Sequence, residues 1–190
     1  MTTEQLDIET IGMAVDRLIT TEMRPGGFEP SGVLQTLYEG ALEKEGSSLT
    51  NAAADRLEQA VDPGDVVIIV TGAGGPPWLP NGENDGPPGA ASIARAVTLG
   101  LGAHPIIAAE ERNMDALTSV SRAIGLNVVS VETLQHRTGA VALMPFSDTE
   151  SEAQEEADQF IEDFEPSAVI GVEELGPNVE GVYHSVEGHD

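Results

Sequence analysis

Apolar residues recur at helical spacing through the N-terminal third of the chain. Between Thr3 and Glu22 they return every three to four positions, which predicts one apolar face on a helix. That face consists of Ile8, Ile11, Val15, Leu18 and Ile19. The same spacing predicts further helices at about 31–44 and 50–61. In the first of these, the residues expected to face inward are Leu34, Leu37, Tyr38, Ala41 and Leu42. We expect this helical segment, residues 1–62, to cover a sheet; a cap or a homo-oligomer surface are the alternatives.

After residue 62 the pattern changes to short apolar runs that alternate with helical stretches. The run 66–70 is continuous and β-branched, which is typical of a strand covered on both faces. Further strands are predicted at 104–109, 127–131, 140–146 and 168–172. Ser147 and Glu150 form a predicted capping box for the helix before the last strand. The alternation predicts an α/β fold whose sheet is mainly parallel, with about five strands. A length of 190 residues suits a single domain.

A long loop rich in Gly and Pro follows the first strand and holds the only tryptophan, Trp78. Loops at the carboxyl edge of a parallel sheet bind ligands, and a loop of this length is usually functional or disordered. Its segment 81–86 gathers polar residues just before a predicted helix. Glu83 or Asp85 could transfer protons there, while backbone N–H groups near Gly89 and Ala90 could receive an anion. A rigid surface loop with Asx-turns is the alternative.

The glycines after the first strand do not complete a dinucleotide fingerprint. In Gly72-Ala73-Gly74-Gly75 the pattern starts well, but its third glycine would fall at Pro77, and the helix begins several residues later. NAD binding remains only a weak alternative. In that case Glu110 or Glu111, at the end of the second predicted strand, would occupy the position of the ribose-binding acid. We therefore expect no cofactor.

Composition narrows the classes of partner. Acidic residues number 33 and basic residues 8, which gives a formal net charge of −25. Nucleic acid and anionic membrane are excluded as partners, because phosphate binding needs clustered Lys and Arg; a small molecule remains. Interspersed acids with almost no lysine indicate a halophilic protein. The absence of cysteine excludes disulfides and thiolate metal sites. Without a signal peptide or an apolar run of spanning length, we expect a cytoplasmic protein.

Carboxylates recur at the expected carboxyl edge of the sheet, where they could hold Mg²⁺ or transfer protons. They are Asp85, Glu110, Glu111, Glu132, Glu173 and Glu174. In a chain this acidic, chance alone places several acids there, so we expect no metal and keep Mg²⁺ as the alternative. His136, His184 and His189 match no metal-binding spacing. Arg112 could meet a substrate carboxylate, although a surface salt bridge is the plainer interpretation.

Two motifs carry a resemblance to a known family. The first is Thr71-Gly72, then Pro76-Pro77, then the run 80–90, which reads PNGENDGPPGA. The second is the looser late segment with Glu173, Gly176-Pro177-Asn178 and Glu180-Gly181-Val182-Tyr183-His184. Together they resemble the D-glutamate cyclase-like C-terminal domain family over roughly 62–190. The chain departs from the family pattern in having Asn84 for Thr and Glu174 for Arg.

The resemblance implies a Rossmann-like three-layer sandwich and a lyase that converts D-glutamate to 5-oxo-D-proline with loss of water. The implied catalytic residues are Glu83, Asp85, Glu173 and His184. The implied substrate-binding residues are Thr71, Gly72, Asn81, Asn84, Gly86, Gly89, Ala90, Arg112, Asn178 and Tyr183. A domain that binds an amino acid, a phosphometabolite or a nucleotide without this chemistry is the alternative. The family domain also continues past this motif, so a chain truncated at its C-terminus is a further alternative.

Overall fold

The computed structural model describes residues 3–22, 32–72, 79–80, 82–174 and 176–184. The chain forms two compact units. One comprises Met1–Gln59 and Gly176–Asp190, and the other comprises Ala60–Leu175.

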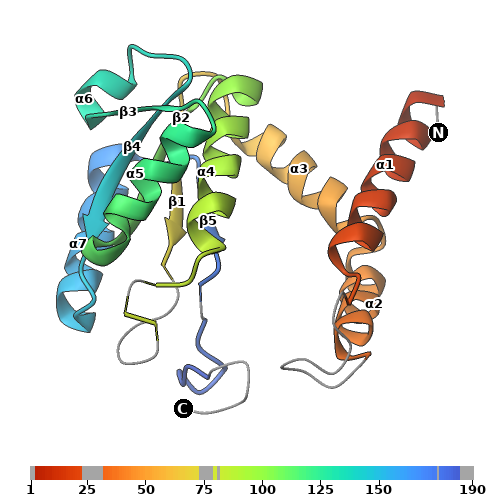
Figure 1. Cartoon of the computed structure of the whole chain (residues 1–190). Coiled ribbons are helices and arrows are strands. Elements are labelled where there is room, and N and C mark those ends of the chain that lie inside the picture. The colour runs from red at the N-terminus through yellow and green to blue at the C-terminus, as the bar shows by residue number, and fades with distance from the viewer. Residues whose placement is uncertain (1–2, 23–31, 73–78, 81, 175, 185–190) are drawn as a thin grey trace. The chain divides into compact units, whose positions relative to one another are not determined.

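The second unit is built on a five-stranded, all-parallel sheet with the strand order β3-β4-β2-β1-β5 (Figure 1). The strands are β1 (Val66–Thr71), β2 (His104–Glu110), β3 (Asn127–Val129), β4 (Ala140–Phe146) and β5 (Ala168–Val172). Their β-branched residues suit a pleated, covered surface, and Val67, Ile69 and Ile107 are fully buried. The sequence prediction of an α/β fold with a parallel sheet is confirmed.

Helices cover both faces of this sheet and complete a Rossmann-like three-layer sandwich (Figure 1). They are α4 (Gly86–Ala96), which continues as a π-helical turn (Val97–Leu101), α5 (Met114–Ala123), α6 (Val131–Leu134) and α7 (Glu150–Phe164). Helices α4 and α5 pack on each other and on the strands. On the sheet, Leu134 of α6 and Phe164 of α7 pack against Ile106 and Ala142.

The small residues of α4 let its backbone approach the sheet closely. Ala90, Ala91 and Ala94 have no exposed surface. At Gly89 an added Cβ would lie 3.0 Å from Cγ1 of Val172, the last residue of β5. The start of α4 is therefore held directly over the carboxyl end of β5.

Two local predictions in this unit were wrong. The third strand ends at Val129 instead of residue 131, because Val131 begins the short helix α6. Ser147 is not the N-cap of α7 as the predicted capping box required; that position is Thr149, which makes no side-chain cap hydrogen bond. The Ser147 hydroxyl instead bonds Oε2 of Glu152 at 2.8 Å.

The first unit contains α1 (Thr3–Ile19), α2 (Val33–Glu45) and α3 (Leu49–Ala60). Helix α1 meets its neighbours through Gly12 and Asp16 rather than through its apolar face. An added Cβ at Gly12 would overlap the side-chain amide of Asn51, so the two helices touch closely there. The apolar stripe of α1 is consequently exposed, from 36% at Val15 to 75% at Leu18.

The inward face predicted for α2 is only partly right. Tyr38 is buried, and its hydroxyl donates to Oδ2 of Asp16 at 3.2 Å. Leu34 and Leu42 are partly buried, whereas Leu37 is 62% exposed and Ala41 is also exposed. Helix α2 thus contacts α1 through the hydrogen bond of the Tyr38 hydroxyl, and not through a broad apolar stripe.

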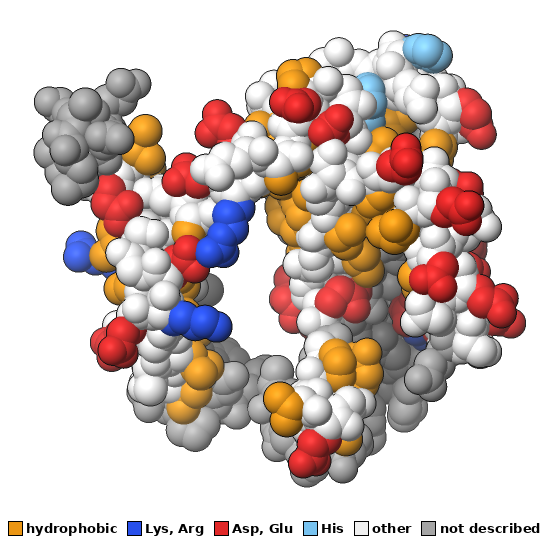
Figure 2. All heavy atoms as spheres, turned by 180° about the vertical axis from the view of Figure 1, so that it is seen from behind, with side chains coloured by type: hydrophobic (Ala, Val, Ile, Leu, Met, Phe, Trp, Pro, Cys, Tyr) orange, Lys and Arg blue, Asp and Glu red, His pale blue; other side chains and the backbone are white. Residues whose placement is uncertain are grey.

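Acidic side chains are spread over the surface of the molecule, as Figure 2 shows for one face. This distribution follows from the formal net charge of −25. Among the described residues, none of the helices has the length and apolar character needed to cross a membrane.

Candidate functional site

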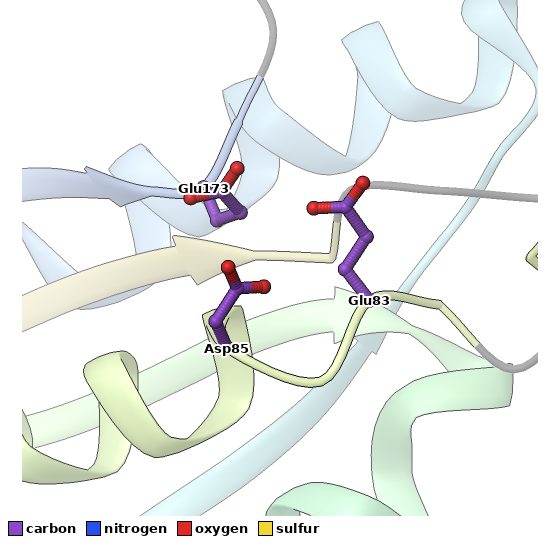
Figure 3. Close-up of side chains that lie close together, drawn as sticks. All are labelled: Glu83, Asp85 and Glu173. Carbon is purple, nitrogen blue, oxygen red and sulfur yellow. The ribbon is translucent and has the colours of Figure 1, made fainter. Parts of the chain in front are cut away.

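Three carboxylates converge at the carboxyl edge of the sheet. One oxygen from each of Glu83, Asp85 and Glu173 lies within 4.8 Å of the other two. Figure 3 shows the three side chains pointing toward one another from the loop before α4, the start of α4 and the end of β5. We refer to these residues as the carboxylate cluster.

Strand register explains why residues so far apart in sequence meet. Thr71 at the end of β1 is paired with Val172 at the end of β5, so Glu173 emerges beside the loop that leaves β1. That loop returns to the same edge at α4, where Asp85 is the N-cap and its Oδ1 accepts the N–H of Gly86 at 3.2 Å. The parallel pairing of β1 and β5 therefore brings the loop before α4 and Glu173 to one point.

Glu173 occupies a strained position in the backbone. Its φ is 52°, in the left-handed region that non-glycine residues rarely adopt. Such a residue costs on the order of 1 kcal/mol or more and often lies at a functional site. The conformation turns the chain sharply after β5 and leaves the Glu173 side chain in the cluster.

The cluster raises the pKa of one of its members, Glu173. Loss of solvation on burial, followed by the charges of Asp85 and Glu83, raises the pKa of the Glu173 carboxyl above its ordinary value. Burial also raises the pKa of Glu174, with further contributions from Glu110 and Glu173. Glu173 therefore holds a proton more readily than a solvated glutamate does.

A buried hydroxyl borders the cluster. Thr71 is 1% exposed, and its Oγ1 finds no hydrogen-bond partner among the described residues. A Cβ on Gly86 would lie 2.7 Å from this oxygen and 3.3 Å from Cβ of Glu173. The hydroxyl thus lies at the junction of Gly86 and the Glu173 side chain, where only glycine fits.

Arg112 lies near the same edge of the sheet, but its guanidinium is already paired with Glu110. Its Nε donates to Oε2 of Glu110 at 2.6 Å, and its Nη2 lies 2.5 Å from Oε1 of that residue. The same Nη2 lies 3.8 Å from Oδ2 of Asp148. The hydrogen bond and charge of Glu110 raise the pKa of Arg112, and the guanidinium is committed to this pair.

A buried amide beside Gly72 was not singled out in the sequence. Asn113 is 1% exposed, and its Nδ2 donates to Oε2 of Glu110 at 3.4 Å. At Gly72, whose φ is 141°, an added Cβ would lie 2.8 Å from that nitrogen. The only sequence signal was its position just after the acids that end β2.

The helix start does not offer the anion-binding amides expected of it. Gly86 donates its N–H to Asp85 Oδ1, and Gly89 donates to the carbonyl oxygen of Asp85 at 3.0 Å. Pro87 and Pro88 have no N–H at all. Ala90 is fully buried, whereas Asn84 is exposed.

Three other predicted site residues lie in the other compact unit. The Oδ1 of Asn178 accepts the N–H groups of Glu180 and Val182, and its Nδ2 lies 2.9 Å from Nε2 of His184. Tyr183 is bridged to Pro177 in an antiparallel pair. These contacts form a compact turn. Asn81 lies outside the described residues.

Comparison with protein-family models matches residues 6–190 to the family described as "D-glutamate cyclase-like, C-terminal". The match includes the N-terminal helices, which the motif resemblance over 62–190 did not cover. A search of curated proteins found no match to the chain.

Proposed function

Since the chain belongs to the D-glutamate cyclase-like C-terminal family, we propose that it is a lyase that converts D-glutamate to 5-oxo-D-proline. The observation that carries the proposal is the convergence of Glu83, Asp85 and Glu173 at one edge of the sheet. All three residues belong to the motifs through which the sequence resembles the family.

The reaction needs groups that can move protons at short range. The α-nitrogen of D-glutamate attacks the γ-carboxyl carbon, a C–N bond forms and a C–O bond breaks. Two of the three ammonium protons leave with one γ-carboxyl oxygen as water. One group must therefore accept a proton from the nitrogen, and another must deliver one to the departing oxygen.

Neighbouring carboxylates suit this exchange. The raised pKa of Glu173 lets this residue hold a proton more readily than a solvated glutamate does, and Glu83 and Asp85 lie beside it. Asp85 is fixed in position by its cap contact with Gly86. We assign proton transfer to the cluster as a unit, with Asp85 and Glu83 approaching from one loop and Glu173 from the other.

The direct test is turnover of D-glutamate by the purified chain at high salt, with 5-oxo-D-proline resolved by chiral chromatography. Asp85→Asn is the informative variant, because Asn also caps helices and so preserves the start of α4. We expect its rate to fall at least about 100-fold, the usual contribution of a positioned acid or base.

The matched control is Asp115→Asn, which neutralises an exposed acid in the first turn of α5. It should turn over like the wild type. A wild-type rate no higher than that of Asp85→Asn would overturn the proposal.

A binding domain without turnover is the second candidate, favoured by the engagement of Arg112 with Glu110. The occupied amides at the start of α4 favour an amino acid over a phosphorylated ligand. Thermal-shift screening separates the two functions, since a ligand at 100 times its Kd stabilises by about 2.7 kcal/mol. Stabilisation by D-glutamate without product would support this second function.

A further inference from the structure

The carboxylate cluster presents a problem of charge. D-Glutamate carries two carboxylates, and three more converge at the proposed site from Glu83, Asp85 and Glu173. Like charges at such distances repel one another. A cation bound at this point would offset the repulsion between these acids and the carboxylates of the substrate.

The neighbouring guanidinium does not supply that cation. Arg112 is held by both oxygens of Glu110, at 2.6 and 2.5 Å, and its Nη2 also lies 3.8 Å from Oδ2 of Asp148. Releasing it would leave Glu110 without its ion-pair partner. Arg112 is therefore paired with Glu110 and does not neutralise the carboxylate cluster, which needs a different positive charge.

The buried hydroxyl of Thr71 is an independent sign of a ligand at this point. Its Oγ1 has no hydrogen-bond partner in the described part of the chain, which is unusual for a side chain that is 1% exposed. It lies beside the stem of Glu173 and beside Gly86, the residue that follows Asp85. A cation, or a water bound to it, would satisfy this oxygen.

The donor set selects the kind of cation. Three carboxylates and a hydroxyl are all hard oxygen ligands, and the chain has no cysteine. Oxygen ligands suit Mg²⁺, Mn²⁺ and Ca²⁺, whereas zinc and copper sites favour nitrogen and sulfur. Mg²⁺ and Mn²⁺ also commonly keep open positions for water or substrate.

We propose that Glu83, Asp85 and Glu173 bind one divalent cation of the Mg²⁺ or Mn²⁺ type, with the Thr71 hydroxyl beside it. A carboxylate of the substrate takes one of its open positions; this second half rests on the proposed function. A cation that uses one oxygen of each carboxylate leaves the other oxygen for proton transfer. The same three residues therefore bind the ion and move protons.

Cation binding can be measured without any turnover. The chain is stripped with a chelator, dialysed at high salt to suppress nonspecific binding to its acidic surface, and titrated with Mn²⁺ while free Mn²⁺ is followed by electron paramagnetic resonance. We expect one tight site per chain. Glu173→Gln and Asp85→Asn should each weaken that site at least about tenfold, as loss of a ligand does.

Two further variants make the test specific. Asp115→Asn removes an exposed acid from the first turn of α5 and should leave Mn²⁺ affinity unchanged. Thr71→Val keeps the shape of the side chain but removes its hydroxyl, and should weaken the site. Unchanged affinity in Thr71→Val would remove Thr71 from the site, and circular dichroism of each variant verifies its fold.

The outcomes separate this inference from the proposed function. Tight Mn²⁺ binding that is lost in the cluster variants, without cyclase turnover, upholds the cation site and overturns the function. Turnover that persists in a chelator, with no tight Mn²⁺ site, upholds the function and overturns the cation site. Equal Mn²⁺ affinity in the wild type, Glu173→Gln and Asp115→Asn also overturns the cation site.

Discussion

The carboxylate of Asp16 in α1 caps the start of α3 through Thr50. Its Oδ1 accepts the backbone N–H of Thr50 at 3.0 Å and the hydroxyl of the same residue at 2.5 Å. Its Oδ2 accepts the N–H of Leu49 at 2.9 Å and the hydroxyl of Tyr38. One buried carboxylate therefore joins all three helices of the first unit.

Asp16→Ala should destabilise the first unit strongly. The change leaves the N–H groups of Leu49 and Thr50 and the Tyr38 hydroxyl without their acceptor, and an unsatisfied buried group costs about 1–3 kcal/mol. We expect the free energy of unfolding to fall by about 2–4 kcal/mol in denaturant titrations at high salt. Asp7→Ala, at an exposed position of the same helix, is the control and should change it by less than about 0.5 kcal/mol.

Asp16 should also make stability depend on acid pH. Burial alone would raise its pKa, but hydrogen bonds from Thr50, Ser48 and Leu49 outweigh that effect and lower the pKa from 3.8 to about 2. The carboxylate therefore stabilises the folded state fully above the unfolded pKa, and this contribution is lost as the pH falls from about 4 through 2. The shift corresponds to about 2 kcal/mol.

The measurement is the difference in unfolding free energy between the wild type and Asp16→Asn from pH 6 to 2. This difference should be constant above about pH 5. Below pH 4 it should become smaller, because only the wild type has an ionised carboxylate at position 16 to lose. A difference that does not vary with pH would contradict the lowered pKa.

Gly86→Ala tests the close contact between α4 and the strand ends. The new Cβ would lie 2.7 Å from Thr71 Oγ1 and 3.3 Å from Glu173 Cβ, so one of these groups must move. We expect a loss of about 1–3 kcal/mol in unfolding free energy, typical of overpacking. In the double variant with Thr71→Ala, part of that loss should return, which a double-mutant cycle measures.

Gly40→Ala is the control for this change. Gly40 lies inside α2, and nothing lies within 4 Å of its added Cβ. Alanine there should stabilise by about 0.4–1 kcal/mol, because it lowers the entropy of the unfolded chain. Destabilisation of both glycine variants by similar amounts would show that crowding at Gly86 is not the cause.

Much of the sheet unit was predictable because its signals are local. The β-branched run of β1 and the helix starts and stops between strands depend on neighbours in sequence, and they predicted five parallel strands correctly. Glu83, Asp85 and Glu173 were named from the sequence because parallel strands end at a common edge. Their mutual approach within 4.8 Å depends on the register of β1 with β5.

Other features depend on tertiary contacts that periodicity does not encode. The apolar stripe of α1 is exposed because Gly12 and Asp16, on another side of that helix, make the contacts with α2 and α3. The positive φ of Glu173 leaves no mark in the sequence. In contrast, the sequence alone could have predicted that the start of α4 offers few N–H groups to an anion, because Pro87 and Pro88 have none.

Glu173→Gln should affect stability and activity in opposite directions. Burial, followed by the charges of Asp85 and Glu83, raises the pKa of Glu173, which means that folding disfavours its ionised form. A neutral amide of the same shape avoids that cost. With a chelator present, the variant should therefore be more stable than the wild type at neutral pH, and the gain should vanish as acid protonates the wild-type carboxyl.

The same substitution removes a group to which we assign proton transfer, so on the proposed function D-glutamate turnover should fall at least about 100-fold. Asp115→Asn, measured in parallel, should show neither change. Natural active sites often sacrifice stability for function in this way. If Glu173→Gln were less stable than the wild type at neutral pH, the ionised carboxylate would have to make a favourable contact that outweighs its burial and its acidic neighbours.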